Sequence, residues 1–107
     1  MITDDQAESA ADFIRDKAEE YALAKASRVY LEQYRKIVKA RKRRELTTGT
    51  EGARDDHAYT SSDYLEVLNG LRDAVKQETY LQWRIEAARV KISAWQSSVS
   101  HRQPQGW

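Results

Sequence analysis

The chain has 107 residues, of which 40% are hydrophobic and 33% are charged, and its formal net charge is +1. This length fits one small domain, and the absence of Cys excludes disulfides, thiolate chemistry and Cys-based zinc sites. No apolar run approaches the roughly 18 residues of a membrane span, and the acidic start MITDDQAESA lacks the apolar centre of a signal peptide. We therefore expect a cytoplasmic protein that makes no membrane contact.

A long first helix is predicted over residues 4–44. The chain contains one Pro and four Gly, so little interrupts helix formation and the fold class is expected to be all-α. Thr3 and Gln6 have the spacing of a capping box, and acidic residues follow where a helix N-terminus favours negative charge. Apolar or small residues then recur in steps of three and four, as expected for one helical face: Ala7, Ala10, Ile14, Ala18, Tyr21, Ala24, Ser27, Leu31, Tyr34 and Val38.

The end of this first helix is strongly basic. Seven of its residues from position 35 to position 44 are Lys or Arg, namely Arg35, Lys36, Lys39, Arg41, Lys42, Arg43 and Arg44. Such a cluster can bind the phosphate backbone of single-stranded or duplex DNA in a salt-dependent way. It can also complement the negative C-terminal end of the helix and be neutralised by the acidic residues that follow. The sequence leaves both interpretations open.

Residues 45–61 are predicted to form a loop, because they contain two Gly, four Thr and no apolar periodicity. His57 lies beside Asp55 and Asp56, but no second His and no calcium-loop spacing accompany it, so no metal site is predicted. The chain also lacks a recognisable nucleophile with its base and a phosphate-binding loop. We expect no cofactor, no catalytic residues and no enzymatic activity.

A second helix is predicted over residues 62–98, with its N-cap supplied by Ser61, Ser62 or Asp63. Its mean apolar spacing is about 3.5 residues, the coiled-coil repeat. Residues 1–99 should therefore form an antiparallel two-helix coiled-coil hairpin, and residues 100–107 a flexible tail. The apolar series of the second helix is Tyr64, Leu68, Leu71, Val75, Glu78, Leu81, Ile85, Ala88, Ile92, Trp95 and Val99.

One charged residue, Glu78, lies inside that second apolar series. Folding the hairpin about residue 53 places Arg28 opposite it. An ion pair between these two residues in the core would fix the register of the helices without adding much stability. Alternatively, Ser27 faces the core while Arg28 and Glu78 stay at the rim.

The second helix carries another apolar stripe, which consists of Tyr80, Trp83, Ala87, Val90 and Ala94. A lone hairpin cannot cover two faces of one helix, so the stripe predicts a homodimer in which two hairpins form a four-helix bundle. The alternative is that the aromatic residues of the stripe lie over the hairpin seam and stay half exposed.

The segments ASRVYLEQYRKIVKA, SSDYLEVLNGLRDAV and RIEAARVKISAWQS resemble small helical-hairpin proteins from the early and recombination regions of tailed phages and prophages. The likeness covers residues 25 to about 98. The second helix of that group often opens with Ser-Pro-Glu-Tyr, and Ser61 to Tyr64 of this chain lack the Pro. The resemblance implies an accessory role in DNA transactions within the host cell cytoplasm, and it transfers no catalytic residues.

Two functions follow as expectations. The first is a non-enzymatic phage accessory protein in DNA recombination or replication, which scaffolds through its coiled coil and contacts DNA through the basic helix end. The second is a protein-only adaptor or inhibitor that binds a host factor through the exposed aromatic stripe. The expected partners are a second copy of the chain, DNA, and a recombination protein or host factor.

Overall fold

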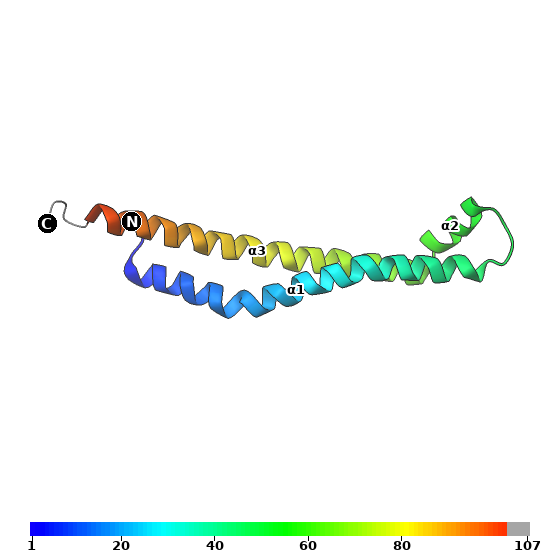
Figure 1. The fold of residues 1–107 in the computed structure, drawn as a ribbon, viewed down its shortest axis with the longest axis horizontal. Helices are drawn as coiled ribbons and strands as arrows, with labels where there is room; N and C mark the ends of the chain where they lie inside the picture. The colour runs from blue at the N-terminus through cyan, green and yellow to red at the C-terminus, as the bar shows by residue number, and fades with distance from the viewer. Residues whose placement is uncertain (103–107) are drawn as a thin grey trace. The chain divides into compact units, whose positions relative to one another are not determined.

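The structure is a computed structural model that describes residues 1–102 of the chain. It contains three α-helices, α1 (Asp4–Glu45), α2 (Glu51–Tyr59) and α3 (Ser62–Arg102) (Figure 1). Because no strand occurs among these described residues, the all-α prediction is confirmed. Within the same range, no helix is both long and apolar enough to cross a membrane.

The two long helices begin where the sequence predicts. At the start of α1 the backbone N–H of Gln6 donates to Thr3 Oγ1 at 3.1 Å, and the N–H of Thr3 donates to Gln6 Oε1 at 2.9 Å. This is a complete capping box. At the start of α3 the N–H of Tyr64 donates to Ser61 Oγ at 3.2 Å. Helix α3 ends at Arg102, beyond the predicted end, so it includes the first part of the predicted tail, and residues 103–107 lie outside the described residues.

The predicted loop over residues 45–61 is wrong for most of its length, because α2 occupies Glu51–Tyr59. Thr50 caps this helix by accepting a hydrogen bond from the N–H of Ala53 at 3.1 Å. Ala58 is fully buried, so one face of α2 packs against the rest of unit 2. The segment has too few apolar residues to show helical periodicity, so its sequence pattern resembles a loop. Gly49, with φ of +119°, lets the backbone turn before α2 begins.

The chain divides into two compact units. Unit 1 consists of Met1–Ala22 and the described part of Thr79–Trp107, and unit 2 consists of Leu23–Glu78. Each unit therefore contains one segment of α1 and one segment of α3, and unit 2 also contains α2 (Figure 1).

The core of unit 1 is a narrow line of buried side chains between its α1 and α3 segments, which we call the seam. Its two helical segments run antiparallel, since Trp95 Nε1 donates to Asp4 Oδ1 at 2.7 Å while Arg84 lies 4.8 Å from the ring centroid of Phe13. Leu81 is the largest fully buried side chain, and Ala18, which was predicted to face the core, is exposed. The buried hydrophobic residues of this unit are Ala7, Ala10, Leu81 and Ala88.

The core of unit 2 lies close to α2. Val38 of α1 packs with Tyr64 and Val67 of α3, and the partly buried side chains of Tyr34 and Leu68 pack against this cluster. The cluster lies near the end of α1 and the start of α3, and Arg28 contacts Glu78 earlier in α1 and later in α3, so these segments are also antiparallel.

The seam of α3 in unit 2 differs from the predicted apolar series. Val67 is 9% exposed and Ala74 is half-buried, whereas Val75, which was predicted to be in the core, is 40% exposed. The other predicted members of the series in this unit are buried, as Tyr64 and Glu78 are, or partly buried, as Leu68 and Leu71 are. A single partner helix covers only a narrow strip of α3, so side chains one position away stay in contact with solvent.

Candidate functional site

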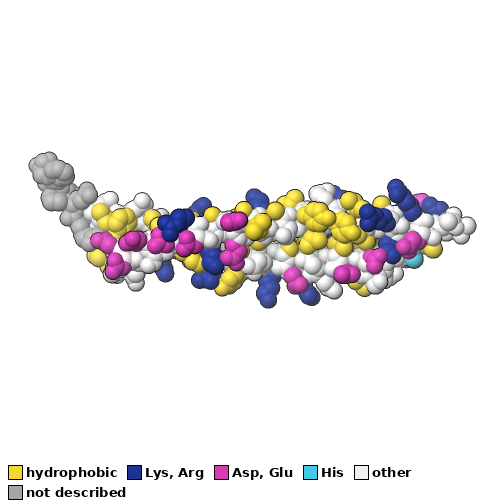
Figure 2. All heavy atoms as spheres, turned by 90° about the horizontal axis from the view of Figure 1, so that it is seen from below, with side chains coloured by type: hydrophobic (Ala, Val, Ile, Leu, Met, Phe, Trp, Pro, Cys, Tyr) yellow, Lys and Arg dark blue, Asp and Glu magenta, His cyan; other side chains and the backbone are white. Residues whose placement is uncertain are grey.

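All seven predicted basic residues lie on the last third of α1, inside unit 2. Figure 2 shows Lys and Arg side chains next to Asp and Glu side chains near the α2 end, beside a group of hydrophobic side chains on the same face. The contacts of the seven cations separate them into two groups. Lys39, Lys42 and Arg43 contact carboxylates, and the other four do not.

Arg43 is the main link between α1 and α2. Its guanidinium forms ion pairs with Glu51 and Asp55, which are four residues apart and so lie on one face of α2. Hydrogen bonding to Glu51 raises the pKa of Arg43 above its ordinary value. This side chain is therefore engaged within the chain and is not free to bind a ligand.

Lys42 and Glu45 form a second group of contacts at the end of α1. The Lys42 ammonium lies 2.9 Å from both Glu45 Oε1 and Asp63 Oδ2, and His57 Nε2 lies 2.8 Å from Glu45 Oε2. Hydrogen bonding to Asp63 and Glu45 raises the pKa of Lys42. Hydrogen bonding to His57 makes the largest contribution to lowering the pKa of Glu45, and hydrogen bonding to Lys42 lowers it further. These contacts neutralise part of the basic cluster, as the second interpretation of the sequence proposed.

Lys39 lies closer to the hydroxyl of an aromatic residue of α2 than it does to any carboxylate that it contacts. Its ammonium donates to the Tyr59 hydroxyl and lies 4.5 Å from the centroid of that ring, whereas Asp55 Oδ1 is 3.8 Å away. Hydrogen bonding to Tyr59 raises the pKa of Lys39. The Tyr59 and Tyr64 rings pack in an edge-to-face arrangement with their centroids 5.2 Å apart.

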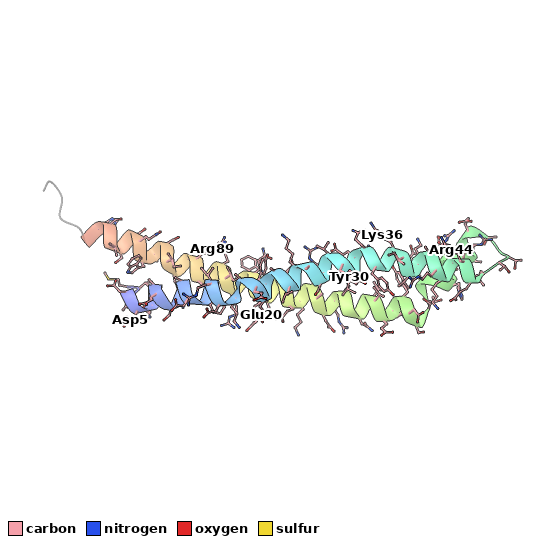
Figure 3. All side chains as sticks on the ribbon, turned by 60° about the horizontal axis from the view of Figure 1, so that its bottom comes forward. Asp5, Glu20, Tyr30, Lys36, Arg44 and Arg89 are labelled. Carbon is pink, nitrogen blue, oxygen red and sulfur yellow. The ribbon has the colours of Figure 1, made fainter. Side chains whose placement is uncertain are left out.

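The remaining four cations have no hydrogen-bond or ion-pair partner among residues 1–102. Lys36 projects from the side of α1 that is turned away from α3 (Figure 3). Nearby carboxylates therefore offset the charge of three of the seven cations, and the other four cations have no such partner. The unpaired group is Arg35, Lys36, Arg41 and Arg44.

A hollow lies between this basic stretch and the two tyrosines. Its volume is about 310 Å³. Residues from all three helices form it, because Tyr59 is the last residue of α2 and Tyr64 lies in the first turn of α3. The lining consists of Arg35, Lys36, Lys39, Tyr59 and Tyr64.

Arg28 and Glu78 form the predicted ion pair within unit 2. The Arg28 guanidinium contacts both Glu78 oxygens, with Nη2 donating to Oε1 at 3.2 Å, and Nη1 donates to Glu32 at 3.0 Å. Glu78 is 8% exposed, and Ser27 is exposed, so Ser27 does not replace the pair in the core. The two hydrogen bonds to Glu78 fix the relative register of α1 and α3 in this unit.

The predicted apolar stripe of α3 is uncovered in unit 1. Tyr80, Trp83 and Val90 are 54%, 66% and 61% exposed, and Ala87 and Ala94 are exposed as well. The seam residue Leu81 is fully buried by comparison. Its own helix pair therefore leaves most of the stripe in contact with solvent, although Arg84 Nη1 donates to the Tyr80 hydroxyl at 3.0 Å.

Metal-ligating side chains do not cluster in the described part of the chain. No group of three or more His, Cys, Asp or Glu residues there could hold a metal ion. His57 and Asp55, which lie close together in the sequence, instead pair with Glu45 and Arg43.

No protein-family model, no curated protein and no solved structure matches the chain. The likeness to phage hairpin proteins therefore stays an expectation from the sequence.

Sequence reasoning missed α2 and with it the contacts of Tyr59 and Asp55. The available signals were a Thr at position 50 followed directly by an acidic residue, and the spacing of four between Glu51 and Asp55. Without apolar periodicity these signals are weak, because Thr and acidic residues are also common in loops.

Proposed function

We propose that the chain is a non-enzymatic protein that assembles through helix packing, as a homodimer of antiparallel two-helix hairpins. The observation that carries this proposal is the exposure of Tyr80, Trp83 and Val90 on one face of α3. Two aromatic side chains that each bury about 150–250 Å² make this face large for a soluble monomer to leave in water.

A second copy of the chain fits this face better than an unrelated partner. The stripe runs in steps of three and four, so an identical stripe related by a two-fold axis packs against it as a coiled-coil seam. Glu86 flanks the stripe on one side and Lys91 flanks it on the other. In a parallel pairing of the two α3 helices, these flanking positions of opposite sign meet across the interface.

A cysteine placed in the stripe tests this assembly, because the natural chain contains no Cys. In a parallel dimer Ala87 faces its own copy, so Ala87→Cys should form a covalent dimer under mild oxidation without loss of helicity. Gln96→Cys is the matched control, since Gln96 is exposed on the opposite side of α3. Equal and slow cross-linking of the two variants would refute the proposed interface.

DNA contact is the second candidate function, and the four unpaired cations favour it. Arg35, Lys36 and Arg44 can approach phosphates without first breaking an ion pair. This contact corresponds to the recombination or replication role that the resemblance implies. Binding of single-stranded and duplex oligonucleotides should weaken steeply between low and physiological salt, and absence of binding at low salt would exclude the contact.

The same exposed stripe also supports an adaptor or inhibitor that binds a host factor. The two functions predict different masses for the purified protein in solution. A protein that docks another partner is a monomer when it is alone, whereas the proposed assembly protein is a dimer.

A further inference from the structure

The hollow between α1, α2 and α3 in unit 2 has the composition of an anion site. Three of its five lining residues are cations, and none is a carboxylate. Arg35 and Lys39 are four residues apart, and Lys36 and Lys39 are three apart, so the three side chains leave neighbouring positions on the helix surface. Their charges therefore act on one small volume of about 310 Å³.

We propose that this hollow binds the 5′-terminal phosphate of a DNA strand. The inference rests on the DNA contact proposed above and names the group that the contact recognises. A terminal phosphate carries about −1.5 to −2 charges and three acceptor oxygens, whereas an internal diester carries a single charge. Three cations that line one hollow match the terminal group better.

The cations are available at little cost to the fold. Neither Arg35 nor Lys36 has a hydrogen-bond or ion-pair partner among the described residues, so binding breaks no contact of theirs. Lys39 has its carboxylate neighbour, Asp55, at 3.8 Å, which is longer than a direct charge-assisted hydrogen bond. A phosphate oxygen can therefore compete for the Lys39 ammonium.

The tyrosines add a donor and a fixed wall. The Tyr59 hydroxyl accepts a hydrogen bond from Lys39, which leaves its own proton to donate to a phosphate oxygen. Tyr64 is 8% exposed, and its ring forms an edge-to-face pair with the Tyr59 ring. Because this packing holds the ring in place, the donor is positioned before the ligand arrives, and less conformational entropy is lost on binding.

The surroundings favour a strand over a free nucleotide. Arg44 is exposed and unpaired, and it lies eight residues after Lys36, about 12 Å along the helix. A strand whose first phosphate occupies the hollow can place a later diester near Arg44. A mononucleotide reaches only the hollow and gains nothing from that cation.

Fluorescence anisotropy with a 3′-labelled single strand tests the proposal. The strand carries either a 5′-phosphate or a 5′-hydroxyl, and the phosphorylated form should bind about fivefold to tenfold more tightly at ~0.1 M salt. Arg35→Gln/Lys36→Gln should abolish this preference. Arg41→Gln/Arg44→Gln removes the same charge from the same helix outside the hollow, so it should weaken both strands and keep the preference. Circular dichroism checks that both variants remain helical.

The outcomes separate the hollow from the wider DNA contact. Equal affinity for the two strands, or a preference that survives Arg35→Gln/Lys36→Gln, overturns the terminal-phosphate site and leaves DNA contact standing. If neither strand binds at low salt, both the terminal-phosphate site and the DNA contact are overturned. Thymidine 5′-monophosphate serves as a competitor: weak displacement supports recognition of a strand, and displacement as effective as that by the unlabelled strand overturns it.

Discussion

Leu81 shows at the scale of one residue how little core a helix pair provides. It is the largest fully buried side chain of the described structure, at 2% exposed. The other buried hydrophobic residues of unit 1 are all Ala, and its larger apolar side chains, such as Ile85 and Ile92, are only partly buried. The stability of unit 1 should therefore depend strongly on this position.

Truncation of Leu81 tests that dependence. Leu81→Ala should lower the free energy of unfolding by about 2–4 kcal/mol, because it removes buried apolar atoms and leaves a cavity. Leu65→Ala removes the same atoms from a side chain that is 49% exposed, and it should cost less than about 1 kcal/mol. Urea unfolding followed by circular dichroism measures both, and similar losses for the two variants would contradict the described seam.

Glu45 gives the structure a dependence on acidic pH. Its contacts with His57 and Lys42 lower its pKa below the ordinary value of 4.5. The folded chain thus favours the charged carboxylate more than the unfolded chain does, and the resulting stability is present above pH 4.5 and lost as the pH falls through the lowered pKa. The Gln side chain of the Glu45→Gln variant does not titrate, so the variant does not show this pH-dependent loss of stability.

The melting temperature of the wild-type chain should accordingly fall more than that of Glu45→Gln between about pH 6 and pH 3. The difference should be small, because the Glu45 side chain is 49% exposed. Thermal unfolding at matched ionic strength measures it. Parallel curves for the two proteins would show that these contacts do not persist in solution.

Helix α2 is the element that departs furthest from the sequence pattern. A cap, one buried Ala and ion pairs to Arg43 hold it, so its stability depends on contacts with α1 and not on an apolar face of its own. These contacts also determine which cations stay free. The element that sequence periodicity misses therefore offsets the charge of two of the seven cations, Lys39 and Arg43.

Ala58→Asp should release α2, because a carboxylate has no space and no partner at a position that is fully buried. The helix contains a single tryptic site, at Arg54. Trypsin should cleave there at least several-fold faster in the variant, since local unfolding exposes the bond. Ala53→Asp, at an exposed position of the same helix, is the control, and equal cleavage rates would contradict the docking of α2.

The two long helices were predictable because capping and apolar periodicity act locally. The capping box at Thr3 and the cap at Ser61 match the starts of α1 and α3, and the register that places Arg28 opposite Glu78 follows from aligning two apolar series. The burial of Val67 beside the predicted Leu68 was not predictable. Both are apolar and both pack in the cluster around Val38, so the apolar pattern alone does not show which of the two is more deeply buried.

The candidate site was predictable only as a list of charges. The sequence places seven cations on one stretch of helix, but most of the partners of the three paired cations come from α2 and α3. Which cations remain unpaired depends on where Asp55, Tyr59 and Asp63 lie in space. The hollow beside Tyr59 has no sequence signal of its own, since its lining comes from three helices.

At the scale of the whole molecule, the exposed stripe of α3 decides between an assembling protein and a docking protein. Changing Trp83 and Val90 together to Lys places two like charges in the proposed dimer interface and leaves the seam of unit 1 intact. The double variant should keep most of its helicity as a monomer. Leu23→Lys/Leu65→Lys, at exposed positions of unit 2, should keep the mass of the wild-type chain.

Sedimentation equilibrium of the wild-type chain provides the decisive measurement. At tens of micromolar, a typical concentration for helical assemblies of moderate affinity, the proposed homodimer should sediment at twice the 12.4 kDa of one chain. Trp83→Lys/Val90→Lys should sediment at the mass of one chain under the same conditions. A wild-type mass equal to that of a single chain would contradict the homodimer and leave the stripe as a docking face for another protein.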